Sequence, residues 1–165
     1  MNTGVMLVPQ SGTVQANDQQ LYYEVHGDGP PLVLVMGIGY DASLWTLAQV
    51  PTLSTQFRVV ILDNRDSGRS SKAIHPYTIA DMADDVAGLL DVLEIQRSHL
   101  LGLSMGGMIA QEFALRHADR LDRPVEQLRS RHVRETLSDE QRPVLGEHVA
   151  QRLAKSRIPV RRGDR

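Results

Sequence analysis

The chain has 165 residues, enough for one domain with a hydrophobic core, and 18 Lys/Arg against 20 Asp/Glu give it a net charge of −2. The absence of cysteine excludes disulfides and a thiol nucleophile and fits a reducing compartment. No signal-peptide pattern is found, and the most apolar stretch, Leu32 to Ile38, is too short to span a bilayer. We therefore expect a cytoplasmic protein that does not bind membranes.

The charge changes sign along the chain. Residues 1–122 hold 7 Lys/Arg and 14 Asp/Glu, whereas residues 123–165 hold 11 Lys/Arg and 6 Asp/Glu. Every aromatic residue precedes position 114. Because the basic part has neither aromatics nor a known nucleic-acid motif, its pattern favours a solvated arginine-rich segment over binding to RNA or DNA. We expect residues 1–122 to form the core and residues 123–165 a helical or disordered tail.

An antiparallel hairpin is predicted near the N-terminus. Thr13–Ala16 and Leu21–Val25 have the composition of strands, and Asn17 and Asp18 between them are turn residues. Two fully apolar runs follow, at Leu32–Met36 and Val59–Leu62. Such runs are typical of strands that are covered on both faces.

Helical patterns separate these runs. Residues 44–53 predict a short helix that bends or ends before Pro51. Thr78 with Asp81 predicts a capping box, followed by an amphipathic helix from Ile79 to Leu93. A third buried strand is expected at Ser98–Leu103. Strands that alternate with helices imply an α/β fold with a mostly parallel sheet and right-handed crossovers.

The motif Gly102-Leu103-Ser104-Met105-Gly106 stands between the third buried strand and a helical pattern. At such a turn the serine adopts an unusual backbone conformation, and its hydroxyl stands clear of the sheet. The glycines on either side remove side chains that would collide. The first amides of the helix favour negative charge at the serine. This context predicts a nucleophilic serine, and the alternative is a glycine-rich helix start with an idle serine.

Taken together, these motifs resemble the α/β-hydrolase superfamily over roughly Thr13 to Asp122. The resemblance rests on Met36-Gly37-Ile38-Gly39 with Trp45, on Asp63-x-Arg65-x-x-Gly68-x-Ser70, and on the motif around Ser104. The chain is most similar to the serine esterase branch that includes methylesterases of the aclacinomycin type. The resemblance implies the strand order 1-2-4-3-5, so that the strand at Ser98–Leu103 is the last one.

The resemblance also implies a site. Ser104 would be the nucleophile that forms an acyl-enzyme, and the backbone N–H groups of Met105 and Ile38 would stabilise the oxyanion. Most relatives have His-Gly where this chain has Met36-Gly37, and we interpret Met36 as a core residue. A serine at position 104 argues against epoxide hydrolases and haloalkane dehalogenases, which place aspartate there. The expected substrate is a small acyl compound, and neither a cofactor nor a metal is expected.

Several other polar residues are interpreted as having no catalytic role. The motif residues Asp63, Arg65, Gly68 and Ser70 are interpreted as structural. Asp84 and Asp85 are expected to be solvated. The remaining histidines before position 118 have no spacing typical of a metal site and are expected on the surface or in loops; they are His26, His75, His99 and His117.

The family pattern is not recognisable after Asp122, and no apolar run typical of a strand occurs between residues 123 and 165. We therefore expect a core truncated after the helix that follows Ser104, or a frame-shifted end. Pro124 suits a first helical turn. In this family the acid and the histidine follow the serine. The candidates that do so are Asp119, Asp122, Asp139, Asp164, His132 and His148.

His148 is the candidate base, but the favoured interpretation is a polar residue beside a helical stripe of Leu145, Val149 and Leu153. Two functions therefore compete. The first is a serine acyl hydrolase, impaired by loss of the acid and histidine and active only weakly on activated aryl esters. The second is a non-catalytic remnant that binds small apolar acyl compounds. An unpaired edge at Ser98–Leu103 would in either case promote dimers or aggregates.

Overall fold

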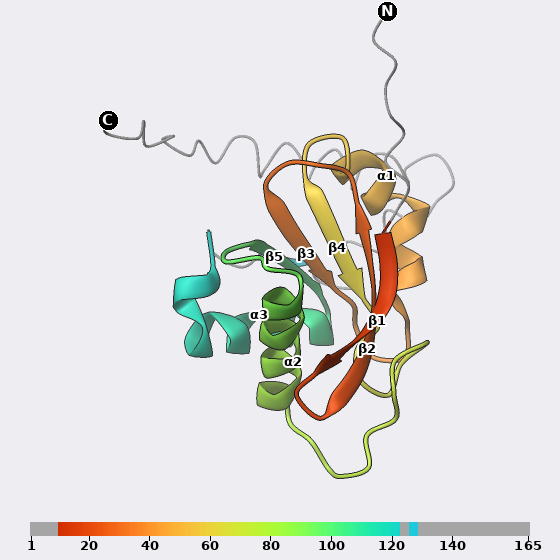
Figure 1. Cartoon of the computed structure of the whole chain (residues 1–165), viewed down its shortest axis with the longest axis vertical. Coiled ribbons are helices and arrows are strands. Elements are labelled where there is room, and N and C mark those ends of the chain that lie inside the picture. Colours follow the sequence, from red (N-terminus) through yellow and green to blue (C-terminus); the bar gives the residue numbers. More distant parts are fainter. Residues whose placement is uncertain (1–9, 123–125, 129–165) are drawn as a thin grey trace, which may run out of the picture.

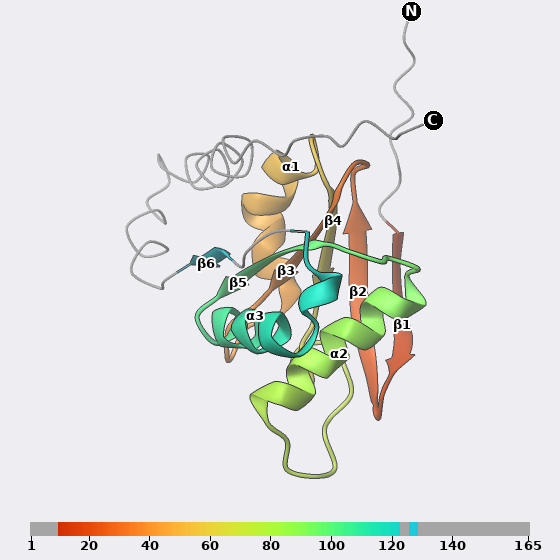
Figure 2. The same ribbon diagram turned by 90° about the vertical axis from the view of Figure 1, so that its left-hand side faces the viewer.

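The sheet of the computed structural model, which describes residues 10–122 and 126–128, has the order β1-β2-β4-β3-β5-β6 (Figures 1 and 2). The strands are β1 (Gln10–Ala16), β2 (Gln19–His26), β3 (Pro31–Val35), β4 (Arg58–Leu62), β5 (His99–Leu103) and β6 (Glu126–Leu128). β1, β2 and β4 pair antiparallel, whereas β4, β3, β5 and β6 pair parallel. The predicted mostly parallel sheet and the order of its first five strands are confirmed.

The predicted hairpin is also confirmed. β1 and β2 pair with Ala16 opposite Gln19, and Asn17 between them has φ 54°. Asparagine tolerates this left-handed conformation better than most residues, which explains its place at the turn.

Helices cover both faces of the sheet. One face carries α2 (Ile79–Val92) and α3 (Met105–Arg116), and the other carries the 3₁₀ helix η1 (Ala42–Leu47) and α1 (Gln49–Leu53) (Figures 1 and 2). A short 3₁₀ helix, η2 (Ala118–Arg120), follows α3. Because successive residues of a strand point to opposite faces, β3 supplies Val33 and Val35 to the α2 and α3 side and Leu32 and Leu34 to the other.

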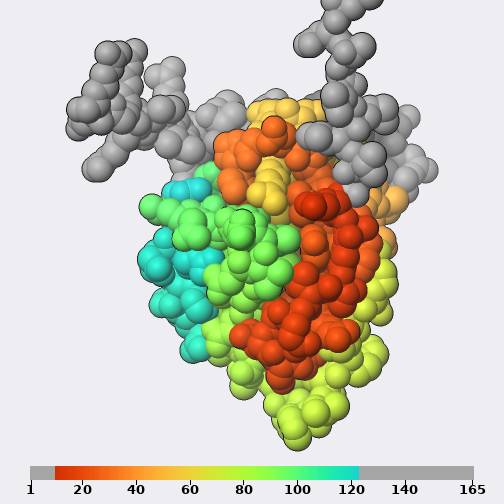
Figure 3. Space-filling model, viewed as in Figure 1, coloured from red at the N-terminus to blue at the C-terminus, as the bar shows by residue number. Residues whose placement is uncertain are grey.

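The amphipathic helix begins as predicted. The side chain of Thr78 accepts a hydrogen bond from the Asp81 backbone, and the Asp81 carboxylate accepts one from the Thr78 N–H at 2.7 Å. α2 then packs against β1, where Gly88 faces Ala16, and Figure 3 shows the green residues of α2 beside the red residues of β1.

The helix predicted over residues 44–53 differs from expectation. It is split at Ala48 into η1 and α1, and α1 continues through Pro51. Pro51 is the third residue of α1, where the missing N–H would have had no partner inside the helix, so proline is tolerated there.

The expectation that nothing of strand type follows β5 is wrong. β6 pairs with β5 from Leu101 to Leu103, where a helical turn after Pro124 was expected. At the other end of β5 both backbone groups of Ser98 are bonded: its N–H donates to Arg120 at 3.0 Å and its carbonyl accepts from Asp122 at 3.0 Å. Self-association through this edge is untested and stays a prediction, as does the boundary between residues 1–122 and 123–165.

Among the described residues, no helix is both long and apolar enough to cross a membrane.

Candidate functional site

The turn between β5 and α3 holds Ser104 in a rare backbone conformation. Ser104 has φ 54° and ψ −117°, outside the regions that side-chain-bearing residues favour. It occupies the N-cap of α3, yet its side chain makes no capping hydrogen bond, and the residue is exposed. The predicted conformation is therefore confirmed, and the hydroxyl is left available for chemistry.

The two flanking glycines are required by close backbone contacts. A Cβ on Gly102 would overlap the carbonyl of Gly106, and a Cβ on Gly106 would overlap the carbonyl of Val35 in β3. α3 thus starts directly against β5 and β3. This packing forces the sharp turn that displays Ser104.

The loop after β3 runs alongside the same turn. A Cβ on Gly37 would lie 3.2 Å from the Cβ of Ser104 and 3.8 Å from the nitrogen of Met105. Ile38 follows Gly37 and is exposed. The loop residues expected to supply one oxyanion donor therefore lie next to the residue expected to supply the other. Met36 is fully buried, as its interpretation as a core residue requires.

A cavity of about 250 Å³ opens beside this turn. Its lining includes Gly37, Ile38, Asn64, Tyr77 and Met105. It combines apolar side chains with polar groups from the loop after β4, as small-molecule sites do.

Asp63 and Ser70 brace the loop that follows β4. The buried carboxylate of Asp63 accepts hydrogen bonds from the N–H of Ala42 and from the backbone and Nε of Arg69, each at 2.8 Å. This ion pair raises the pKa of Arg69. The hydroxyl of Ser70 donates to the carbonyl of Asp63 at 2.6 Å and accepts from the N–H of Tyr22 at 2.9 Å. These contacts agree with the structural role expected for Asp63 and Ser70.

The expectation of a solvated position is wrong for Asp85, whereas Asp84, whose side chain is 33% exposed, is only partly buried. Asp85 is 2% exposed and pairs with Arg65. Asp84 binds Arg116 at 2.7 Å and His117 at 2.8 Å, which links α2 to α3. Helical spacing could have revealed Asp85, since it shares a face with Met82 and Leu89, both buried.

The histidines have mixed outcomes. His75 is exposed in a loop, as expected. His99 is buried in β5 with its ring against Phe57, which contradicts a surface or loop position. β5 is covered on both faces along its whole length, so its first residue, His99, lies in the core as well. Among the described residues, no group of three His, Asp or Glu could hold a metal ion.

The candidates for the acid and the base are only partly described. Asp119 and Asp122 are exposed, and Asp122 pairs with Arg97 at 3.3 Å. The other candidates lie outside the described residues; they are His132, Asp139, His148 and Asp164. Asn64, which the sequence analysis did not single out, lines the cavity. Its side chain donates a hydrogen bond to the carbonyl of Met36, next to Gly37. No spacing in the sequence pointed to Asn64.

Comparisons with known proteins agree with this geometry. A family model described as alpha/beta hydrolase fold matches residues 30–125, more than half of the chain. The chain is 40% identical over 121 residues to "Putative carbamate hydrolase RutD" of Caulobacter sp. strain K31, and the match covers 70% of this chain and 43% of that protein.

Two solved structures are similar to this chain. A hydrolase from Pseudomonas aeruginosa PA01 has a TM-score of 0.67 and 38% identity, covering 71% of this chain and 45% of that one. The enol-lactonase from Burkholderia xenovorans LB400 has a TM-score of 0.66 and 41% identity, covering 69% and 45%. The chain spans less than half the length of these relatives. With its sheet order, its turn at Ser104 and the matching family model, the chain belongs to the α/β-hydrolase fold family.

Proposed function

We propose that this chain carries the nucleophile and the oxyanion hole of a serine hydrolase acting on carboxylic esters or related acyl compounds. The observation that supports this function best is the exposed Ser104 in its strained turn, next to the Gly37-Ile38 loop. An idle serine at the start of a helix would be free to cap it, and this one does not.

In the proposed reaction the Ser104 oxygen attacks the acyl carbonyl carbon and loses its proton to a base. The carbonyl oxygen becomes an oxyanion, which the N–H groups of Ile38 and Met105 stabilise. The intermediate collapses to an acyl-enzyme as the alcohol leaves with a proton. Water then attacks the acyl-enzyme and gives one of its protons to the base. The bond to Ser104 breaks, the acid is released, and the base passes that proton to the Ser104 oxygen.

The cavity and the relatives bear on the substrate. The cavity volume of about 250 Å³ leaves room for a small acyl or alcohol group rather than a large ligand. The relatives are named for carbamate and enol-lactone hydrolysis, and both compounds present a carbonyl carbon bonded to a leaving heteroatom. We therefore propose small esters, lactones or carbamates as the substrate class. The cytoplasmic location stays a prediction.

A fluorophosphonate probe tests the proposal, because it labels an activated serine and not an idle one. We expect mass spectrometry to find the adduct on Ser104, and Ser104→Ala to abolish it. Ser43→Ala, which removes a different exposed serine, is the control and should label normally. Labelling without turnover of aryl esters would indicate an activated nucleophile whose acyl-enzyme is not hydrolysed. Binding of acyl compounds without any labelling would favour the non-catalytic alternative.

A further inference from the structure

Asn64 makes a buried hydrogen bond to the backbone next to the proposed oxyanion hole. Its Nδ2 donates to the carbonyl of Met36 at 2.9 Å. Asn64 is 5% exposed and Met36 is fully buried. The bond joins the loop after β4 to the end of β3, and Asn64 also lines the cavity beside Ser104.

This bond fixes a peptide plane close to the reacting centre. The Met36 carbonyl and the Gly37 N–H belong to one rigid peptide unit. Only the φ and ψ angles of Gly37 separate that unit from the next one, which carries the Ile38 N–H. Anchoring the Met36 carbonyl therefore limits where the Ile38 N–H can point.

The Met36 carbonyl needs this anchor because the next position, 37, requires a glycine. A Cβ at this position would lie 3.0 Å from the carbonyl oxygen of Leu103 and 3.2 Å from the Cβ of Ser104, so glycine is favoured. Glycine is also the residue with the most backbone freedom. The close approach that brings the loop to Ser104 thus leaves it without steric restraint of its own, and Asn64 supplies one from outside.

Asn64 is itself held firmly. Its carbonyl accepts a hydrogen bond from the N–H of Ser67 at 3.0 Å, and the N–H of the preceding Asp63 donates to Tyr22 at 3.0 Å. The Asp63 carboxylate further ties this loop to Ala42, the first residue of η1 after the loop that holds Gly37. The donor therefore sits on a braced support, as precise placement of a catalytic group requires.

We propose that Asn64 is a positioning residue for the oxyanion hole, which it serves by holding the Met36 carbonyl so that the Ile38 N–H points at the oxyanion. The effect of Asn64 on the oxyanion rests on the proposed function, whereas the anchoring of the Gly37 loop does not.

The test compares Asn64→Leu, which has a similar size and no donor, with the unchanged protein. Asn64→Asp, which keeps the shape and also lacks the donor, is the second variant. Thr52→Val is the matched control, because it removes a side-chain bond to a carbonyl, that of Ala48 at 3.1 Å, in α1 away from the site. The rate of fluorophosphonate labelling and its non-covalent inhibition constant are measured separately.

We expect both Asn64 variants to slow the covalent step about tenfold or more, with the inhibition constant little changed. Complete loss of one oxyanion donor costs about 10²–10³ in rate, and a misaligned donor should cost less. Thr52→Val should keep the rate. Equal rates in all four proteins would overturn the inference, and so would a loss in Thr52→Val as large as in the Asn64 variants.

A second measurement separates this inference from the proposed function. Backbone ¹⁵N order parameters at Gly37 and Ile38 should fall in the Asn64 variants and not in Thr52→Val, whether or not Ser104 reacts. If the unchanged protein is not labelled, the proposed function fails, and unchanged order parameters would then overturn the anchoring as well.

Discussion

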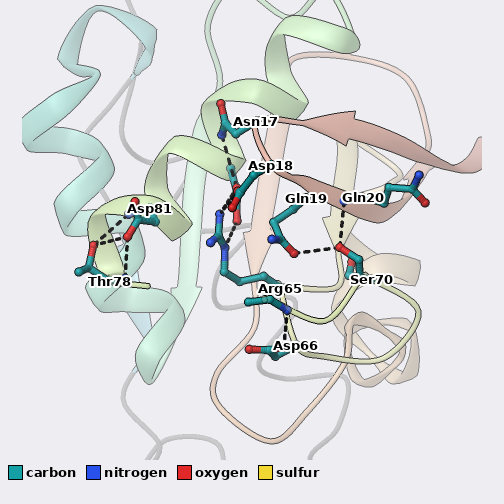
Figure 4. A network of polar contacts seen from close by, with 12 residues as sticks. Asn17, Asp18, Gln19, Gln20, Arg65, Asp66, Ser70, Thr78 and Asp81 are labelled. Carbon is teal, nitrogen blue, oxygen red and sulfur yellow. Dashed lines mark hydrogen bonds and ion pairs between the residues drawn. The ribbon is translucent and has the colours of Figure 1, made fainter. Parts of the chain in front are cut away.

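The guanidinium of Arg65 makes two parallel hydrogen bonds to the carboxylate of Asp85, from Nε at 2.7 Å and from Nη2 at 2.8 Å. Both side chains are 4% exposed. Burial raises the pKa of Asp85, and the bonds to Asp85 raise the pKa of Arg65. Arg65 also reaches Asp18 at 3.1 Å (Figure 4). Its guanidinium lies over the ring of Tyr77. The pair thus joins α2, the loop after β4 and the hairpin turn.

Removing one partner of this pair should be costly. Asp85→Asn leaves a buried guanidinium whose remaining ion pair is with the exposed Asp18, so we expect a loss of about 3–5 kcal/mol in the free energy of unfolding. Urea denaturation measures the loss. Asp122→Asn, which removes an exposed ion pair with Arg97, should cost about 0–1 kcal/mol.

The double variant Arg65→Met with Asp85→Leu distinguishes the cause. It leaves no buried charge unpaired. Its loss in the free energy of unfolding should therefore be smaller than the sum of the losses of Arg65→Met alone and Asp85→Leu alone. Additive losses would mean that packing, and not the charge pair, accounts for the cost.

The parts of the fold that the sequence predicted are those where one element contains its own signal. β3 and β4 are continuous apolar runs, and α2 is an amphipathic stripe that begins at a capping box. The turn at Ser104 is recognisable from the two glycines that flank the serine. β6 has no such signal, because Glu126-Gln127-Leu128 is held by backbone pairing with β5 and not by an apolar run. The contacts of Asn64 and Arg65 are harder still to predict from sequence. Asn64 bonds Met36 at the end of β3, and Arg65 bonds Asp85 in α2, so each partner lies far away along the chain.

The glycine at position 106 should tolerate no side chain. In Gly106→Ala the new Cβ would overlap the carbonyl of Val35 in β3, and neither backbone segment can move without disturbing the sheet. We expect a loss of several kcal/mol or failure to fold, measured by thermal unfolding. Gly12→Ala is the control. There the Cβ would meet only the Tyr23 ring at 3.5 Å, an ordinary contact, so its melting temperature should not fall.

The conformation of Ser104 should cost stability that glycine recovers. A residue with a side chain at φ 54° and ψ −117° carries strain of about 1–3 kcal/mol, whereas glycine adopts such angles readily. Glycine loses about 0.5–1 kcal/mol through its greater freedom in the unfolded chain. Ser104→Gly should therefore raise the free energy of unfolding by about 1 kcal/mol. Ser104→Ala keeps the strain and should not gain. Equal stabilities of the two variants would show that the turn is relaxed.

Asp84 should make stability depend on acid pH. Hydrogen bonds from Arg116 and His117 hold the pKa of Asp84 below its ordinary value of 3.8. A carboxylate with a lowered pKa in the folded state stabilises the protein above its unfolded pKa. That contribution is lost as the pH falls through the lower, folded value. The carboxylate is 33% exposed, so solvent screening limits the contribution to about 0.5–1 kcal/mol.

Asp84→Asn isolates this contribution from that of the other carboxylates. At neutral pH the variant should be less stable than the unchanged protein by that amount. The difference should shrink as the pH falls below 3.8 and should be smallest below the lower, folded pKa, where Asp84 is protonated in both the folded and the unfolded chain. Urea unfolding across this range measures it, and Asp119→Asn, at an exposed position in η2, should show little difference at any pH. A difference for Asp84→Asn that persists unchanged in acid would mean that Asp84 acts through its shape and hydrogen bonds, and that its charge contributes nothing to the contact between α2 and α3.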